Sequence, residues 1–114
     1  EINKLQRGPV KLYYGSTTGN MLENNKRKVE SVFRACKEKG LSVAVHAENE
    51  SIIRENVKRF RKVSDLRPEA HSEIRSRETE INAVGELLEI QKTAGCRLHF
   101  CHISTAEAAG MIPR

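Results

Sequence analysis

Residues 96–105, CRLHFCHIST, form a short apolar run that passes directly into a helix signal. A run of this length and apolar content, bounded by polar residues, is typical of a buried strand. Ser104 and Glu107 then have the spacing of a capping box, in which a hydroxyl and a carboxylate satisfy the free amides at the start of a helix. The stretch therefore predicts a strand followed at once by a helix, which is the repeating unit of α/β proteins.

Two further apolar runs precede this stretch, residues 9–15 (PVKLYYG) and 41–48 (LSVAVHAE), and helical patterns separate the three runs. The positions that recur at helical spacing are Val29, Val32, Phe33 and Cys36; Ile53, Val57 and Phe60; and Val84, Leu87, Leu88 and Gln91. Gly40 and Gly95 fit positions just past the ends of two helices. The order predicts an α/β fold whose three strands are parallel and joined by helical crossovers.

Each of the three runs carries one residue that is able to hold a divalent metal: Lys11, His46 and His102. Because active sites of parallel sheets form at the carboxyl ends of the strands, these residues are expected to converge there. Alternation of side chains along the third strand places His102 on the same side as Leu98 and Phe100. Either histidine alone is also compatible with a hydrogen-bonded structural role. Lys11 is either a buried amine that adds carbon dioxide to form a carbamate, or a side chain whose ammonium group reaches solvent.

The composition argues against several classes of protein. The 114 residues suffice for one domain, 31% of them are charged, and the net charge is +5. The basic residues alternate with glutamates, and no aromatic residues are interleaved with them, so a nucleic-acid surface is not expected. No apolar stretch is long enough to span a bilayer and no secretion signal opens the chain, so we expect no membrane partner and a cytoplasmic location. Cys36, Cys96 and Cys101 lack the spacing of a zinc ribbon and are interpreted as small buried residues.

Four short motifs follow one another along the chain: PVKLYYGSTTG (9–19), VHAEN (45–49), EINAV (80–84) and LHFCHIST (98–105). In this order they resemble the dihydroorotases of the cyclic amidohydrolase superfamily. The resemblance implies a (β/α)8 TIM barrel with two divalent metal ions, usually zinc, and a small-molecule substrate. It implies that carboxylated Lys11 bridges the metals and that His46 and His102 are ligands. The implied reaction interconverts N-carbamoyl-aspartate and dihydroorotate in pyrimidine biosynthesis.

The resemblance covers only the centre of such a barrel. The family's His-x-His pair on the first strand, the substrate-binding arginine after it and the aspartate near the eighth strand have no counterpart in residues 1–114. We therefore expect a single barrel segment, incomplete at both ends and covering about strands 4 to 6. The catalytic aspartate is expected beyond Arg114, so that no catalytic residue lies within residues 1–114 and no activity comes from them alone. A three-stranded parallel sheet has two open edges, which either further chain or a second copy is expected to cover.

Two other functions fit the same motifs. One is a related amidohydrolase, an allantoinase or a hydantoinase, and the other is a catalytically dead homologue that acts as a scaffold. Glu48 and Asn49 either support the metal site or end a strand and cap the next helix, whereas Glu80 is assigned a structural role.

Polar segments complete the chain. Residues 15–19 are interpreted as a loop on the substrate side of the barrel. The helix that starts at Ser51 is expected to stop near Pro68, because the residue before a proline avoids helical geometry. A charged connection is predicted over residues 63–79, with His71, Arg75 and Arg77 exposed to solvent.

Overall fold

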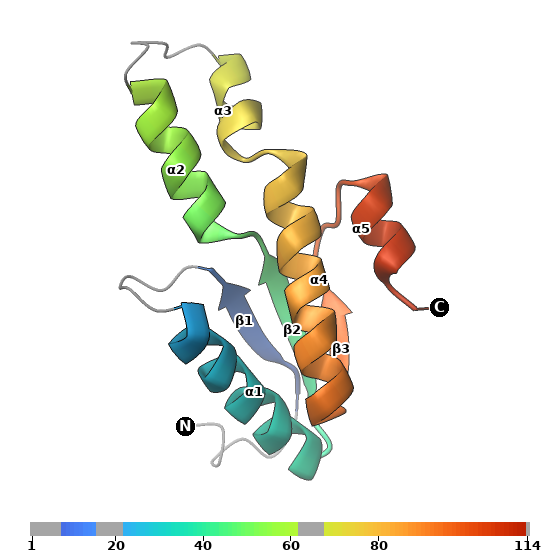
Figure 1. Ribbon diagram of the computed structural model, residues 1–114. Coiled ribbons are helices and arrows are strands. Elements are labelled where there is room, and N and C mark those ends of the chain that lie inside the picture. Colours follow the sequence, from blue (N-terminus) through green and yellow to red (C-terminus); the bar gives the residue numbers. More distant parts are fainter. Residues whose placement is uncertain (1–7, 16–21, 62–67, 114) are drawn as a thin grey trace.

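A computed structural model describes residues 8–15, 22–61 and 68–113. Its elements are β1 (Val10–Tyr14), α1 (Leu22–Glu38), β2 (Ser42–Ala47), α2 (Glu50–Arg61), α3 (Pro68–Ile74), α4 (Arg77–Ala94), β3 (Arg97–Phe100) and α5 (Ala106–Met111). The three strands form one parallel sheet in the order β1-β2-β3 (Figure 1). The predicted α/β fold with three parallel strands is thereby confirmed.

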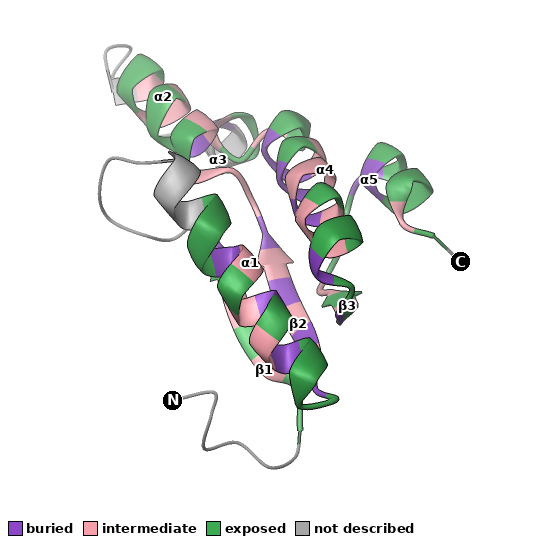
Figure 2. Cartoon of the chain, turned by 60° about the horizontal axis from the view of Figure 1, so that its bottom comes forward, coloured by how far each residue is buried: buried purple, intermediate pink, exposed green. Residues whose placement is uncertain are grey.

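One face of the sheet packs against α1 and α4. Alternation along β2 directs Val43, Val45 and Ala47 into this layer, so that buried and half-buried residues alternate along the strand (Figure 2). Phe33 of α1 and Leu87 of α4 are fully buried in the same cluster. Burying a side chain of this size contributes about 1.5–3 kcal/mol, so this layer is the main source of cohesion between sheet and helices.

Tyr14 anchors β1 to α4. Its hydroxyl donates a hydrogen bond to the carboxylate of Glu86, and the Nζ of Lys26 lies 3.7 Å from the same carboxylate. Burial, together with the bond to Glu86 and the charge of that group, raises the pKa of Tyr14 above its ordinary value. The phenol therefore stays protonated and remains a donor.

The opposite face of the sheet carries the polar residues. Lys11 of β1 pairs in register with Ala44 of β2, which in turn pairs with His99 of β3, and Tyr13 pairs with His46. Lys11, Tyr13 and His99 are exposed on this face, Tyr13 with 61% of its surface. Two of the three predicted ligands, Lys11 and His46, therefore share the side of the sheet that faces away from α1 and α4.

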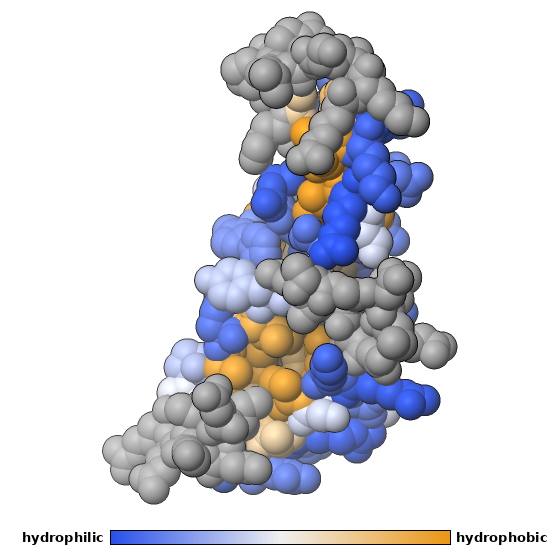
Figure 3. Space-filling model, turned by 90° about the vertical axis from the view of Figure 1, so that its left-hand side faces the viewer, coloured by the Kyte–Doolittle hydropathy of each residue, from blue (hydrophilic) through white to orange (hydrophobic). Residues whose placement is uncertain are grey.

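Both outer strands are edges within the described part of the chain, because β1 and β3 each pair with β2 alone. Along the β1 and α1 side of the molecule, apolar atoms reach the surface (Figure 3). Val10 and Leu12 of β1 are half-buried there and pack against the core. An edge of this kind offers its free amide and carbonyl groups to a further strand.

Helices α2 and α3 extend beyond the carboxyl ends of the strands (Figure 1). Asn56 of α2 ties them together by donating from Nδ2 to the carbonyl oxygen of Ile74 at 3.0 Å. The prediction of a charged connection over residues 63–79 is wrong for its later part. α3 begins at Pro68 and α4 begins at Arg77. Proline is tolerated at the first position of a helix, because the amide there has no partner within the helix.

The cap of α5 differs from the predicted capping box. The N-cap is Thr105 rather than Ser104, and its Oγ1 accepts a hydrogen bond from the amide of Ala108 at 3.3 Å. Glu107 takes no part in a box, because its carboxylate lies 2.5 Å from Nη2 of Arg77 at the start of α4. The helix start was therefore predicted correctly, but its polar partners were not.

The predicted glycine positions after α1 and α4 are confirmed. Gly40 and Gly95 have φ angles of 66° and 69°, the left-handed conformation in which glycine commonly ends helices. Within the described ranges, none of the helices combines the length and the apolar character needed to cross a membrane.

Candidate metal centre

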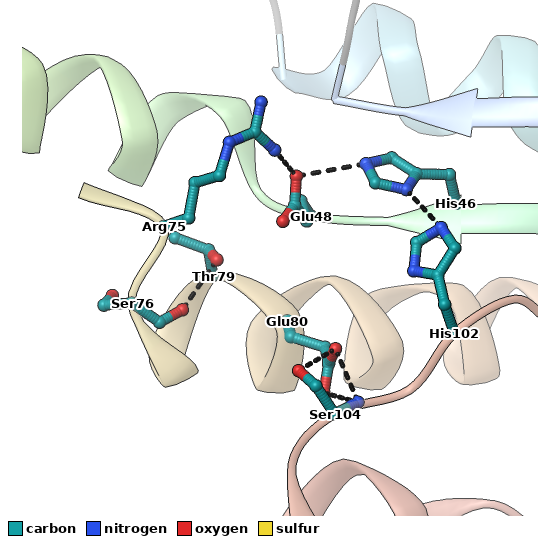
Figure 4. A network of polar contacts seen from close by, with 8 residues as sticks. All are labelled: His46, Glu48, Arg75, Ser76, Thr79, Glu80, His102 and Ser104. Atoms are coloured by element: carbon teal, nitrogen blue, oxygen red, sulfur yellow. Dashed lines mark hydrogen bonds and ion pairs between the residues drawn. The ribbon is translucent and has the colours of Figure 1, made fainter. Parts of the chain in front are cut away.

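Two histidines meet where β2 and β3 end (Figure 4). Nδ1 of His46 lies 2.9 Å from Nε2 of His102, and the ring centroids are 4.7 Å apart. Only 24% of the His46 side chain is exposed, whereas His102 is exposed. The strand order predicts that these two residues converge, and the rings do so. Their role as metal ligands stays a prediction.

His102 reaches His46 through a local change of backbone direction. Alternation places His102 beside Phe100 on the helix-covered face, and this prediction is wrong. β3 ends at Phe100, and His102 has a φ of 40°, a conformation that residues with a Cβ rarely adopt. The turn brings the imidazole to the opposite side of the sheet, against His46.

Glu48 holds the other nitrogen of His46. Its Oε2 lies 3.0 Å from Nε2 of His46 and also pairs with Nη1 of Arg75. A carboxylate only accepts hydrogen bonds, so it favours the tautomer with the proton on Nε2 and leaves the Nδ1 lone pair facing His102. Arg75 is exposed in the turn between α3 and α4, as predicted, and its guanidinium also pairs with this carboxylate.

Lys11 lies on the same face but contacts a different residue. Its Nζ is 2.8 Å from Sγ of Cys101, the residue that precedes His102, and 5.4 Å from the centroid of the Tyr13 ring. Lys11 is exposed on this face, and its role as a carbamate ligand stays a prediction. The prediction of buried cysteines holds for Cys36 and Cys96, and is wrong for Cys101, which is half-exposed. Cys101 differs because it follows the strand and points to the uncovered face.

The two imidazoles fit a divalent metal of the zinc type. Two nitrogen ligands at the usual zinc distance of about 2.0–2.1 Å lie at most about 4 Å apart, and the nitrogens of His46 and His102 are 2.9 Å apart. The carboxylate of Glu48 behind His46 is the arrangement that orients metal-binding histidines. Across the described residues, no group of three or more histidine, cysteine, aspartate or glutamate side chains is placed to hold a metal. The two nitrogens of the histidine pair would thus suffice for only part of a ligand set.

Glu80 of α4 binds the turn that follows His102 (Figure 4). Glu80 is 8% exposed, and its carboxylate accepts hydrogen bonds from the backbone and side chain of both Ser104 and Thr105. Burial acts to raise the pKa of Glu80, but the bonds from Thr105 and Ser104 outweigh it and hold the pKa below its ordinary value. The pattern that could have revealed this contact is an acidic residue on a buried helix face opposite two successive hydroxyl residues.

Asn49 takes the capping role that was one of its two interpretations. Its Oδ1 accepts from the amide of Ser51 at 3.0 Å, at the start of α2. Glu48 supports His46 instead.

Some positions considered from the sequence lie outside the described residues. They are the side chain of His71, most of the loop at residues 15–19, and Arg114. The catalytic aspartate was expected beyond Arg114, and the described residues, which end at residue 113, do not test this. The absence of a catalytic residue from this chain therefore stays a prediction.

Comparison with known proteins finds relatives within one superfamily. No family model matches the chain. It is 34% identical over 101 residues to a dihydroorotase from Methanosarcina acetivorans, an alignment that covers 89% of this chain and 21% of that relative. It is 40% identical over 82 residues to an allantoinase from Escherichia coli, covering 68% of this chain and 17% of that relative. The chain is thus homologous to enzymes of the cyclic amidohydrolase superfamily.

A solved cyclic amidohydrolase shares the fold as well. The L-hydantoinase (dihydropyrimidinase) from Arthrobacter aurescens matches with a TM-score of 0.80 at 26% identity, covering 90% of this chain and 23% of that one. The predicted resemblance to this superfamily is thereby confirmed, and the family is metal-dependent and acts on small molecules. The chain spans about a fifth of the length of the curated relatives that it matches.

Proposed function

We propose that the protein is a metal-dependent cyclic amidohydrolase of the dihydroorotase type, which interconverts N-carbamoyl-aspartate and dihydroorotate. The observation that carries the proposal is the pair of ring nitrogens, on His46 and His102, that face each other at the carboxyl end of a parallel sheet. In this proposal β1, β2 and β3 are the fourth to sixth strands of a (β/α)8 barrel. The uncovered face of the sheet, which bears Lys11, is then the inner face of the barrel.

In this proposal His46, His102 and a carbamate of Lys11 would hold two divalent ions, zinc, together with ligands from outside the described residues. The carbamate forms when the neutral amine of Lys11 attacks the carbon of carbon dioxide: a nitrogen–carbon bond forms, one C=O π bond opens, and the nitrogen releases a proton. The metal ions, when bound, activate water and polarise the scissile carbonyl. The exposure of Lys11 on the inner face leaves its amine open to carbon dioxide.

The residues of this chain have separate tasks in the proposal. Glu48 keeps the proton of His46 on Nε2, so that Nδ1 is the nitrogen offered to the metal. Arg75 offsets the charge of Glu48 and holds the carboxylate in place. Both act from the rim of the sheet without contacting the reacting amide.

Metal content tests the ligand assignment. In the full-length protein, Lys11→Ala, His46→Ala and His102→Ala are each expected to lower the amount of bound zinc, measured by elemental analysis. His99→Ala is the matched control, because His99 is exposed on the same face but pairs with Ala44, further from the strand ends than His46. Unchanged zinc in the first three variants refutes the assignment, and a carbamate carbon signal that persists in Lys11→Ala refutes the role of Lys11.

A second candidate function has specific support. The chain is 40% identical to an allantoinase and matches the structure of an L-hydantoinase, and both similarities support a related cyclic amide as the substrate. Comparing kcat/KM for dihydroorotate, allantoin and hydantoin decides between them, and we expect dihydroorotate to be preferred. A full-length protein that binds zinc but turns over none of the three supports a catalytically dead scaffold instead.

A further inference from the structure

Glu80 concentrates its hydrogen bonds on two consecutive residues. Its Oε1 accepts from the amide of Thr105 at 2.8 Å and from Oγ1 of Thr105 at 2.6 Å. Its Oε2 accepts from the amide of Ser104 at 3.1 Å and from Oγ of Ser104 at 2.9 Å. The carboxylate of a residue that is 8% exposed requires such partners, and all of those described here come from the turn after His102.

His102 needs an external constraint to keep its conformation. A φ of 40° crowds the Cβ of any residue other than glycine, and such conformations persist when the surrounding structure holds them. β3 ends at Phe100, two residues before His102, and the turn bound by Glu80 begins at Ser104, two residues after His102. The backbone of His102 is thus fixed on one side by the sheet and on the other by Glu80.

We propose that Glu80 is a positioning residue that keeps His102 turned onto the side of the sheet occupied by His46. By holding Ser104 and Thr105, it prevents the segment from continuing the alternation of β3, which would carry the imidazole to the side of Phe100. The consequence for metal binding rests on the function proposed above. The placement of His102 itself does not require a metal, because it follows from the turn.

The test compares Glu80→Gln with Glu78→Gln in the full-length protein. A glutamine amide has one accepting oxygen and directs its NH2 group at donors, so it cannot reproduce the contacts of Glu80. Glu78 is an exposed carboxylate in the first turn of the same helix, so its loss matches the change of charge. In the metal-free protein, Glu80→Gln is expected to speed hydrogen exchange at the amides of Ser104 and Thr105 and to shift the imidazole ¹⁵N signals of His102.

Zinc affinity is the second measurement, made by competition with a chromophoric chelator. Loss of a partner that orients a ligand typically weakens metal binding by about 10–100-fold, and this range is expected for Glu80→Gln. Glu78→Gln is expected to match the wild type in all three measurements. Glu80→Asp keeps the charge and is expected to recover part of the affinity.

Two outcomes of the metal-free measurements overturn the proposal. If exchange at Ser104 and Thr105 is faster in Glu80→Gln but the His102 signals are unchanged, Glu80 anchors the turn without positioning His102. If exchange is unchanged, Glu80 does not hold the turn. If Glu80→Gln does not fold, Ser104→Ala replaces it in the test, because it removes only the hydrogen bond from Oγ of Ser104 and leaves Glu80 with its other partners. The ¹⁵N signals of His102 are then expected to shift in the same direction by a smaller amount. Equal zinc affinity in wild type and His102→Ala is a failure of the proposed function, and the metal-free measurements then still decide the role of Glu80.

Discussion

Replacing Glu48 by alanine is expected to weaken zinc binding by about tenfold. Glu48 Oε2 lies 3.0 Å from Nε2 of His46 and also pairs with Arg75. Without the carboxylate, the imidazole is free to carry its proton on Nδ1 or to rotate about χ2. Either change takes the accepting nitrogen away from His102.

The magnitude follows from the geometry and exposure of this contact. A hydrogen bond to a charged group contributes about 1.5–3 kcal/mol. The side chains of Glu48 and His46 are 21% and 24% exposed, so water competes for both and the lower end applies. A loss of about 1.5 kcal/mol corresponds to about a tenfold change in a dissociation constant. Competition with a chromophoric chelator near neutral pH measures this constant.

Glu50→Ala provides the control. Glu50 also lies just after β2, but its Oε1 pairs with Nε of Arg54 at 3.8 Å on the surface of α2. The zinc affinity of Glu48→Gln is expected to lie between those of wild type and Glu48→Ala, because the glutamine carbonyl oxygen still accepts a hydrogen bond from Nε2 of His46. If Glu48→Ala and Glu50→Ala bind zinc equally well, Glu48 does not orient His46 and the reasoning is refuted.

Three further predictions concern stability, measured as the free energy of unfolding in urea. Gly15→Ala is expected to be destabilising, because Gly15 has a φ of 91° and an added Cβ would collide with the carbonyl oxygen of Glu48. The left-handed backbone alone costs about 1–2 kcal/mol, and an unchanged unfolding midpoint contradicts this account. Leu87→Ala, at a fully buried position, is expected to cost about 2–5 kcal/mol, and a loss as small as that of an exposed residue argues against its place in the core. Glu80 has a lowered pKa, so its stabilising effect is present above its unfolded pKa and is lost as the pH falls through the folded one. The difference in the free energy of unfolding between metal-free wild type and Glu80→Gln should therefore shrink as the pH falls. A difference that grows contradicts this prediction.

The sheet and its covering helices could be predicted because their apolar periodicity reflects burial directly. Phe33 and Leu87 were placed on inner helix faces, and both are fully buried. Helix α3 was missed, since residues 68–74 carry little apolar signal. Its end is held by tertiary contacts, such as those from Asn56 to the backbone near Ile74.

The orientation of His102 could not be predicted from the pattern of its strand. Alternation holds only while the backbone stays extended, and β3 stops at Phe100. What turns the chain afterwards is a contact with Glu80, which lies 24 residues from Ser104 in the sequence. Local spacing therefore identified the residues of the candidate site, whereas their directions depend on contacts between distant segments.

Sheet register, rather than the length of the connection, sets the spacing of the two histidines. Val45 pairs with Phe100, and the amide of Cys101 donates to the carbonyl of Val45 at 2.9 Å, so the strand ends are locked to each other. The 56 positions that separate His46 from His102 include the pair α2 and α3, which projects away from the sheet. Insertions or deletions in that pair leave the backbone pairing of the two strand ends in place. The lengths of α2 and α3 can thus change without altering the register of β2 and β3.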